Sequence, residues 1–320
     1  MTVLVLTSEE DVTADMVIHR LAQRGTPVLR LDPATIPGRV ALAARITAGG
    51  EVAGHITTDR QRLALRDIRS VWLRRPGAPG ADAAEQREWV SLETERAFYG
   101  ALRATGLPWM NDPDAVARSR YKVWQLRAAH EAGLLVPETL VTTDPAAAER
   151  FAEDGPAIVK SVSGRHPEDP PVTLPTARVP ADADFSGVAA AATCLQREVA
   201  KLADLRLTVV GEQMFPCVIT SKDRALDWRF LPADECDWSL SEAPAAVTAG
   251  VRRYMAAAGL VYAALDFAMD AAGQYWFLEA NQGGQFGFVE ITTGAPISQA
   301  IADWLTHPAP SPAGAIPCPR

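Results

Sequence analysis

The sequence lacks the markers of several common protein classes. Its cysteines are few and form no Cys-x-x-Cys pair, which argues against a zinc or thiol-redox motif and fits a reducing cytoplasm; they are Cys194, Cys217, Cys236 and Cys318. No apolar run approaches the roughly 18 residues of a membrane-spanning helix, so we expect neither a membrane segment nor a signal peptide. The pattern Gly-x-x-x-x-Gly-Lys-Ser/Thr is also missing, which excludes a Walker-type nucleotide site.

Basic residues are fewer than acidic ones. Thirty-one Lys and Arg stand against 39 Asp and Glu, which gives a formal net charge of −8. A protein that coats nucleic acid needs a basic surface, so this balance argues against a nucleic-acid partner. Hydrophobic residues make up 48% and charged residues 22%, ordinary values for a globular protein that exclude wholesale disorder. A chain of 320 residues has room for about two average domains.

The first 112 residues alternate between strand and helix patterns. Short apolar runs predict strands at 3–7, 28–31, 40–46, 51–57 and 70–73. Gly49-Gly50 lies between the third and fourth of these strands and predicts a hairpin. A helix is expected over 83–105, and we place its Trp89 in the core together with Trp72 and Trp109. These patterns predict an N-terminal α/β domain over residues 1–112.

The remaining sequence predicts two subdomains and a tail. Asp112-Pro113 is a typical helix start, and helical spacing continues to Gly133. We expect a central subdomain at 113–190, a C-terminal subdomain at 191–306, a Ser/Gly/Pro-rich loop at 161–171 and a loose tail at 307–320. The C-terminal subdomain is expected to contain helices at 245–258 and 297–305 and paired strands at 261–269 and 275–278. The fold class is therefore α/β (α+β).

Two lysines lie on different predicted elements. Lys122 falls within a helix, and Lys160 ends an apolar strand immediately before the loop 161–171. An ammonium group beside a Gly/Ser loop suits phosphate oxygens, which take point charges and backbone N–H donors. Taken alone, each lysine is more typical of a solvated surface.

Three oxygen-bearing side chains fall on the predicted C-terminal strand pair. Glu279 and Asn281 are two residues apart and so project from one face, with Asp266 on the partner strand within cross-strand reach. Such hard oxygen ligands leave room for water and phosphate, as a Mg²⁺–nucleotide site requires. The apolar flanks make these carboxylates costly to bury without a cation. Ion pairing of the carboxylates to arginines is the alternative interpretation.

A weaker signal lies between these two groups. Gln196-Arg197-Glu198-Val199 ends one predicted strand, and Asp204-Leu205-Arg206 begins the next. The backbone of a hinge at 196–199 is suited to pair with an adenine edge, and Asp204 is suited to accept hydrogen bonds from ribose hydroxyls. An acidic residue beside a strand is more often simply exposed to solvent.

Taken in order, these residues resemble the ATP-grasp ligase superfamily over about residues 111 to 305. The order is Lys122, Lys160, the hinge 196–199, Asp204 with Arg206, Asp266, and Glu279-x-Asn281. The resemblance implies an ATP-grasp fold with an N-terminal pre-ATP-grasp α/β domain. It further implies that both lysines contact ATP phosphates, that the loop after Lys160 closes over them, and that Asp266, Glu279 and Asn281 hold Mg²⁺.

Five segments narrow the resemblance to the ribosomal-peptide maturases called graspetide synthetases, which include the microviridin ligases. They are Val71–Pro76, Met110–Pro113, Ala203–Gly211, Asp227–Arg229 and Phe277–Gly287. The family joins Asp or Glu carboxylates of a precursor peptide, made of a leader and a core, to Ser/Thr hydroxyls or Lys amines within it. Two positions depart from the family's pattern: Gln282-Gly283 follows Asn281 where Pro-Asn is usual, and Arg197-Glu198 replaces a commoner acidic–aromatic pair.

The resemblance implies that a carboxylate attacks the γ-phosphorus of ATP to give an acyl phosphate and ADP, after which a hydroxyl or amine displaces phosphate. Alignment and charge neutralisation dominate such transfers, so we expect Arg206 to face the nucleotide and the acyl phosphate. Arg229 and Arg74 are candidates for contact with the substrate carboxylate or phosphate, because guanidinium groups bind both bidentately. Many members are homodimers, so a homodimer is also expected.

Two other functions stay open at this point. One is a glutamate-adding or dipeptide-forming ATP-grasp ligase, which shares the carboxylate activation but uses another acceptor. The other is a non-catalytic adaptor that binds ATP or a peptide.

Overall fold

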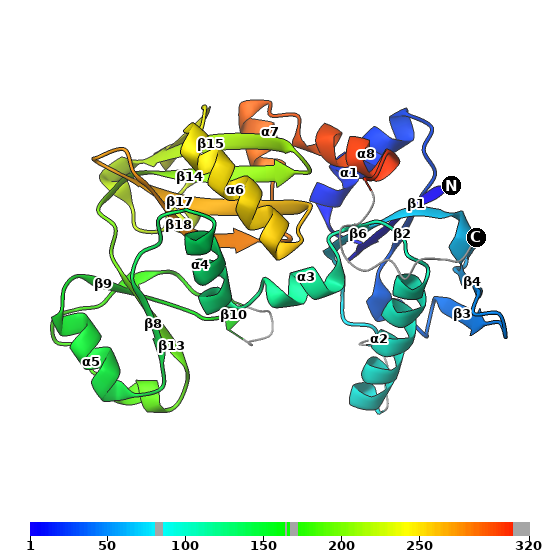
Figure 1. The fold of residues 1–320 in the computed structure, drawn as a ribbon, viewed down its shortest axis with the longest axis horizontal. Coiled ribbons are helices and arrows are strands. Elements are labelled where there is room, and N and C mark those ends of the chain that lie inside the picture. The colour runs from blue at the N-terminus through cyan, green and yellow to red at the C-terminus, as the bar shows by residue number, and fades with distance from the viewer. Residues whose placement is uncertain (81–85, 164, 167–171, 310–320) are drawn as a thin grey trace. The chain divides into compact units, whose positions relative to one another are not determined.

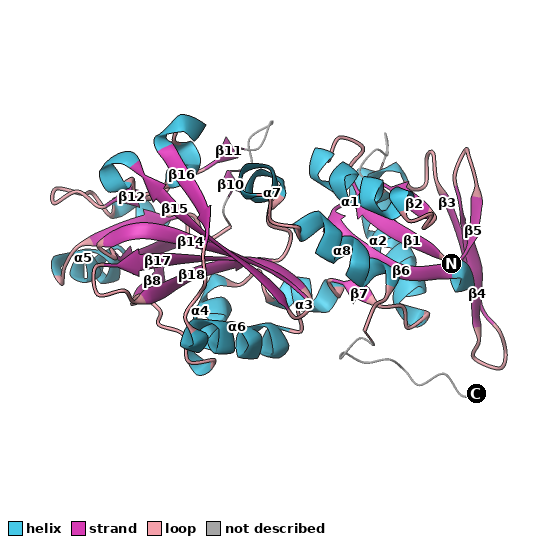
Figure 2. Ribbon diagram, turned by 90° about the horizontal axis from the view of Figure 1, so that it is seen from above, coloured by secondary structure: helices cyan, strands magenta, loops and turns pink. Residues whose placement is uncertain are grey.

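A computed structural model describes residues 1–80, 86–163, 165–166 and 172–309 of the chain. These residues form two compact units (Figures 1 and 2). Unit 1 comprises Met1–Val116, Gly259–Tyr262 and Gln282–Arg320, and unit 2 comprises Ala117–Ala258 and Ala263–Asn281. Unit 1 thus takes in residues 282–306, which we assigned from the sequence to the C-terminal subdomain. The division of the rest at residue 190 stays a prediction.

Unit 1 contains a parallel sheet with the strand order β2-β1-β6-β7. Its strands are β1 (Thr2–Thr7), β2 (Val28–Leu31), β6 (Ile68–Arg75) and β7 (Trp109–Met110). The apolar run in β1 is completely buried, as expected for a parallel strand covered on both faces. The C-terminal helix belongs to this unit because it packs on α1 and β6, where the hydroxyl of Ser70 donates to the carbonyl of Leu305 at 2.7 Å.

Among the described residues four helices belong to unit 1, and the first of them starts at a side-chain cap. They are α1 (Val12–Gln23), α2 (Arg87–Ala104), α7 (Gly287–Thr293) and α8 (Ile297–Thr306), and α3 (Pro113–Arg118) follows at its boundary. Asp11 caps α1 by accepting hydrogen bonds from the backbone amides of Thr13 and Ala14. The predicted hairpin is confirmed as β3 (Ala41–Ile46) and β4 (Val52–Thr57), to which β5 (Arg62–Ala64) adds a third strand.

The expectation that Trp89 lies in the core is wrong. Trp72 and Trp109 are buried, but Trp89 is 61% exposed. α2 buries Phe98 and Leu102, and Phe98 follows Trp89 by nine residues, or about two and a half turns. Trp89 therefore lies on the opposite side of the helix, although it is one of the apolar residues that recur along this segment.

Unit 2 contains a four-stranded sheet with the order β12-β9-β13-β8. Its strands are β8 (Thr139–Thr142), β9 (Ala157–Lys160), β12 (Ala177–Arg178) and β13 (Thr193–Arg197). The helix α5 (Pro145–Glu153) packs on this sheet through Ala148 and Phe151. In the predicted loop 161–171, Arg165–His166 forms the strand β10, which pairs with β11 (Val172–Thr173), whereas residues 164 and 167–171 lie outside the described residues.

A five-stranded sheet forms the other half of unit 2, with the order β16-β15-β14-β17-β18. Its strands are β14 (Lys201–Val210), β15 (Gln213–Ser221), β16 (Cys236–Leu240), β17 (Tyr262–Asp270) and β18 (Tyr275–Asn281). The helices α4 (Lys122–Glu131) and α6 (Ala245–Ala258) pack together, and α4 lies against β18 (Figure 1). Short 3-10 turns at Pro33–Thr35, Leu65–Asp67, Ser186–Ala189, Lys222–Arg224, Trp228–Phe230 and Ala233–Glu235 complete the described secondary structure.

The single helix expected from Asp112 to Gly133 is instead two helices, α3 and α4, separated at residues 119–121. The side chain of Gln125 explains the break. Its Nε2 donates to the carbonyls of Ser119 at 2.6 Å and Ala280 at 3.1 Å, and its Oε1 accepts from the amide of Ala280 at 2.8 Å. This buried amide fixes the start of α4 against β18. Within the described part of the chain, no helix combines the length and apolarity needed to cross a bilayer.

Candidate active site

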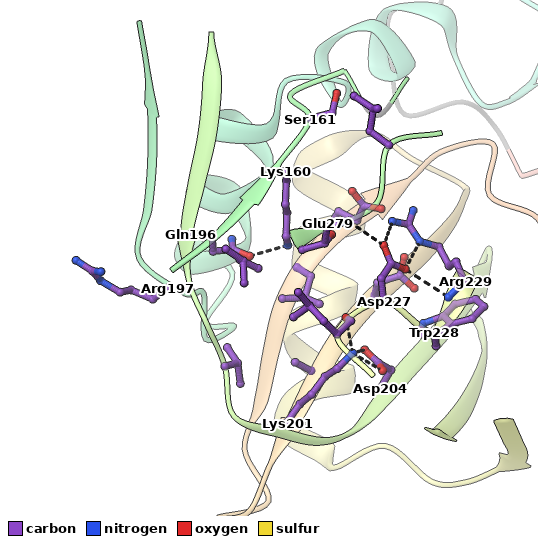
Figure 3. Close-up of a pocket in the computed structure, with 18 of the residues that line it drawn as sticks. Lys160, Ser161, Gln196, Arg197, Lys201, Asp204, Asp227, Trp228, Arg229 and Glu279 are labelled. Atoms are coloured by element: carbon purple, nitrogen blue, oxygen red, sulfur yellow. Dashed lines mark hydrogen bonds and ion pairs between the residues drawn. The ribbon is translucent and has the colours of Figure 1, made fainter. Parts of the chain in front are cut away.

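A pocket in unit 2 contains most of the side chains that the sequence singled out (Figure 3). Both sheets of the unit and the first residue of α4 contribute to its lining. The predicted site residues that line it are Lys122, Lys160, Gln196, Arg197, Val199, Asp204, Arg229, Asp266 and Glu279. Glu198, Arg206, Asn281 and Arg74 are not part of its lining.

Two carboxylates face each other in this pocket. Asp266 on β17 and Glu279 on β18 are direct cross-strand partners, as the sequence predicted. Each one binds a separate cation: Nη1 of Arg206 donates to both oxygens of Asp266 at 2.9 and 2.8 Å, and Nζ of Lys122 contacts Glu279 at 2.9 Å. The ion pairing that we kept as an alternative is therefore present for Asp266.

The two carboxyl groups differ in their electrostatic environment. Burial raises the pKa of Asp266 above its ordinary value, although the Arg206 guanidinium opposes this effect. Burial acts most strongly on Glu279 and would raise its pKa, but Lys122, Lys160 and Arg229 together outweigh it and lower the pKa of that carboxyl. Of the two carboxyl groups Glu279 thus has its pKa lowered and Asp266 has its pKa raised, with Arg206 limiting that rise.

The donor set at these strands fits a magnesium ion. Two carboxylates lie opposite each other, and Asn281 follows Glu279 by two residues, so its amide projects from the same side of β18. Among the described residues no group of three or more His, Cys, Asp and Glu side chains is placed to hold a metal ion, so any cation here would rely on Asp266, Glu279 and the neutral Asn281. Few protein oxygens suit Mg²⁺, which keeps several water or phosphate ligands.

The two predicted lysines are brought together at this pocket. Lys160 is the last residue of β9, and its Nζ donates to Oε1 of Gln196 at 2.7 Å. Burial lowers the pKa of Lys160 to about 8, with Glu279 opposing the shift and the neighbouring Lys122 adding to it. Two ammonium groups close to one carboxylate form a cluster suited to the several charges of a polyphosphate.

The segment 196–199 is divided between the pocket and the outside. The side chain of Arg197 points away from the pocket (Figure 3) and lies over the Phe151 ring, 4.0 Å from its centre. Glu198 accepts a hydrogen bond from Nε of Arg178 at 2.9 Å. The backbone amides of Arg197 and Glu198 donate to carbonyls of neighbouring loops at 2.9 and 3.0 Å. Gln196 and Val199 are the members of this segment whose positions suit a ligand.

Lys201 lines the pocket but was missed by the sequence reasoning. Its Nζ binds both oxygens of Asp204, at 2.8 and 2.6 Å, and the carbonyl of Leu226 at 3.0 Å. Burial raises the pKa of Asp204 to about 6, and Lys201 opposes this rise. Lys201 and Asp204 are three residues apart on β14, a spacing that on a regular strand puts side chains on opposite faces, so the pattern gave no signal.

The three predicted arginines have different surroundings. Arg229 lies at the pocket and donates from Nε and Nη2 to the Asp227 carboxylate at 2.7 and 2.6 Å, which raises the pKa of the guanidinium. Arg206 contacts the pocket through Asp266. Arg74 lies in unit 1 and is 4% exposed.

Arg74 contacts the turn that follows Asn281 rather than the residues of the pocket. It donates to the carbonyls of Gly283 and Gly284 and to Oε1 of Gln285, the last at 2.6 Å. These contacts occupy both terminal nitrogens of the guanidinium, and Nε lies 3.4 Å from Oδ2 of Asp11.

Comparisons with known proteins agree with this geometry. Residues 2–116 match the family model of the MvdD pre-ATP grasp domain. The structure is similar to that of the macrocyclase MdnC from Microcystis aeruginosa MRC bound with the precursor peptide MdnA, with 28% identity and a TM-score of 0.84 over 96% of this chain and 100% of that one. No protein with curated annotation matches the sequence significantly.

Two further solved structures share this likeness. The macrocyclase MdnB from the same organism is 28% identical, with a TM-score of 0.77 over 96% of this chain and 99% of that one. The ATP-grasp ligase PsnB, complexed with a minimal precursor, Mg and ADP, is 26% identical, with a TM-score of 0.76 over 95% of this chain and 96% of that one. The chain is thus similar over nearly its whole length to ATP-grasp ligases of the graspetide type, and its N-terminal residues 2–116 match the MvdD pre-ATP grasp domain.

Proposed function

We propose that this ligase uses ATP and Mg²⁺ to join Asp or Glu side chains of a ribosomally synthesised precursor peptide to Ser/Thr hydroxyls or Lys amines of the same peptide. The observation that carries the proposal is the pocket in unit 2, where opposed carboxylates on β17 and β18 lie beside two lysines. The likeness to MdnC and PsnB, both solved with precursor peptides, supports the substrate class.

In this proposal the pocket binds the nucleotide in three parts. The segment 196–199 meets the adenine edge through Gln196 and Val199, and Asp204, oriented by Lys201, accepts from the ribose hydroxyls. Lys122 and Lys160 contact the phosphates. Asp266, Glu279 and Asn281 hold Mg²⁺, which when bound neutralises phosphate charge and aligns the γ-phosphoryl group.

The arginines act on the charge of the reacting groups. The peptide carboxylate attacks the γ-phosphorus, the acyl phosphate and ADP form, and the peptide's hydroxyl or amine then displaces inorganic phosphate. Arg229 lies at the pocket and suits contact with the transferred phosphoryl group or the carboxylate. Arg206 donates to both oxygens of Asp266 and so favours the charged form of that carboxyl. Arg74, which is buried in unit 1, has no part in this scheme.

The test is a mass measurement on a peptide encoded beside the gene, incubated with enzyme, ATP and Mg²⁺. Loss of one water mass for each bond is expected, and Glu279→Gln should abolish it. The matched control is Glu212→Gln, because Glu212 is an exposed glutamate in the turn between β14 and β15 of the same sheet. A gain of one amino-acid residue mass would instead support a glutamate-adding or dipeptide-forming ligase. ATP binding without any change in peptide mass would support the adaptor.

A further inference from the structure

Thr139, on the strand next to the pocket, carries a role that its position in the sequence does not reveal. It is the first residue of β8 and is the direct cross-strand partner of Gln196 on β13. On the other side of β13, Lys160 is the partner of Cys194, two residues before Gln196. Paired residues project from the same face of a sheet, and diagonal neighbours lie within reach of long side chains. Thr139, Gln196 and Lys160 therefore form a row across one face.

The hydrogen bonds along this row have a fixed direction. The hydroxyl of Thr139 donates to the carbonyl of Pro137 at 2.9 Å, which uses its only proton. Its oxygen then accepts from Nε2 of Gln196 at 2.8 Å. With its nitrogen facing Thr139, the amide turns its oxygen toward Lys160, where it accepts from Nζ at 2.7 Å. Gln196 is 2% exposed, so bulk solvent has little access to compete for these groups.

This arrangement determines what the lysine offers to a ligand. An ammonium group has three N–H donors, and one of them is directed to Gln196, which leaves two for phosphate oxygens in the pocket. If Thr139 lost its hydroxyl, Nε2 of Gln196 would have no acceptor on that side. The amide would then lose the bond that holds its nitrogen on that side, and the direction of its oxygen toward Lys160 would be fixed less firmly.

We propose that Thr139 is a positioning residue for phosphate binding, which acts through the Gln196 amide to hold the Lys160 ammonium in the pocket. The inference rests on the proposed function because it takes ATP as the ligand of this pocket. It assigns a role in phosphate affinity to a residue outside the pocket, on the strand behind it. None of the chain's motifs identifies this residue.

The experiment compares the binding of ATP with Mg²⁺ and the binding of adenosine, which lacks the phosphates, by titration calorimetry. Thr139→Val is expected to weaken ATP binding about tenfold and to leave adenosine binding unchanged, and Thr139→Ser is expected to restore ATP binding. Thr143→Val is the matched control, because Thr143 is exposed and directly follows the same strand. In a Lys160→Met background, Thr139→Val is expected to have no further effect on ATP binding.

The possible failures are distinguishable. ATP binding by Thr139→Val equal to that of the wild type would overturn the inference, as would an equal loss of adenosine binding or a further tenfold loss in the Lys160→Met background. Failure of the wild-type protein to bind ATP at all would contradict the proposed function itself. Wild-type ATP binding that Lys160→Met weakens and Thr139→Val does not would leave the proposed function intact and remove only the role of Thr139.

Discussion

Asp266 and Glu279 face each other across β17 and β18, yet each carboxylate is bound to a cation from a different element. Arg206 of β14 binds Asp266, and Lys122 at the start of α4 binds Glu279. Two carboxylates at this separation would otherwise repel each other and favour protonation of one of them. Each of the two opposed carboxylates therefore has its own bound cation, which offsets this repulsion.

This relationship predicts a strong coupling between Arg206 and Asp266. Arg206→Met leaves a buried carboxylate without its cation and is expected to lower the free energy of unfolding by about 3 kcal/mol. In the Asp266→Asn background the same substitution should cost much less, because no charge remains to be compensated. Urea denaturation of the four proteins of this cycle measures the coupling. Equal losses in the two backgrounds would mean that the pair contributes nothing to stability.

Asn281 is expected to act on the metal rather than on the nucleotide. Asn281→Ala should raise the Mg²⁺ concentration for half-maximal ATP turnover at least about tenfold, since it removes one of the three oxygen ligands that we propose. Gln274→Ala provides a control, because Gln274 is exposed and lies in the turn before β18. An unchanged Mg²⁺ dependence in the Asn281 variant would show that the ion is bound elsewhere.

Asp204 is expected to make stability depend on pH. Its pKa is raised to about 6 in the folded state, chiefly by burial. Folding therefore takes up a proton in the pH range between the ordinary pKa of an aspartate and about 6. The associated stability is complete at lower pH and is lost as pH rises through 6, by up to about 1.4 kcal/mol per unit. The free energy of unfolding of the wild type minus that of Asp204→Asn should thus fall between pH 4.5 and 7. A difference that rises with pH would show that the Lys201 pair outweighs burial.

Two buried tyrosines predict opposite effects of removing a hydroxyl. Among the described residues, none accepts or donates a hydrogen bond at the Tyr254 hydroxyl, and burial raises the pKa of that group. Tyr254→Phe is therefore expected to raise the free energy of unfolding by about 1 kcal/mol. The hydroxyl of Tyr262 donates to the carbonyl of Gly284 at 2.7 Å, so Tyr262→Phe should lower it by a similar amount. Thermal melting of both variants tests the pair, and a loss of stability in Tyr254→Phe would indicate a bound water at that hydroxyl.

The exposed position of Trp89 has a simple consequence for stability. Trp89→Ala should change the free energy of unfolding by less than about 0.5 kcal/mol. Trp72→Ala, which empties a fully packed site on β6, should cost about 3 to 5 kcal/mol. A large loss in the Trp89 variant would mean that another surface covers this part of α2.

The sequence predicted those helices and strands whose formation depends on residues close together in the chain. The buried run of β1, the Gly-Gly hairpin of β3 and β4, and the helix α6 were all recognisable, because strand and helix periods are written into consecutive residues. The opposition of Asp266 and Glu279 was also predictable, since the two strands are joined by a short turn and the register follows from it. Both lysines were placed with these carboxylates by the resemblance to the ATP-grasp ligases, which the order of these residues carries.

Contacts between distant segments were not predictable in this way. Gln125 interrupts a continuous helical pattern by binding the backbone of Ala280, which lies 155 residues away. Arg74 was expected at a substrate because guanidinium groups bind carboxylates, but the carbonyls of Gly283 and Gly284 take its donors. The sequence did not indicate Lys201 as a site residue, because residues three apart on a regular strand point to opposite faces and Lys201 was not expected to reach Asp204. In each case the deciding partner is a backbone group or a side chain that no local period identifies.

Arg197 stands where the family more commonly has an acidic residue. In this chain its guanidinium contacts the C-terminal end of a helix. Its Nη1 donates to the carbonyls of Phe151 and Gly155 at 2.6 and 2.9 Å, at the C-terminal end of α5, where a helix dipole favours positive charge. The next residue, Glu198, is bound to Arg178 on β12. Exchanging only the hinge for a relative's acidic–aromatic pair would place a carboxylate against the negative end of α5 and leave Arg178 without this partner. Chimeric ligases built from this chain should therefore transfer the hinge together with α5 and β12 as one module.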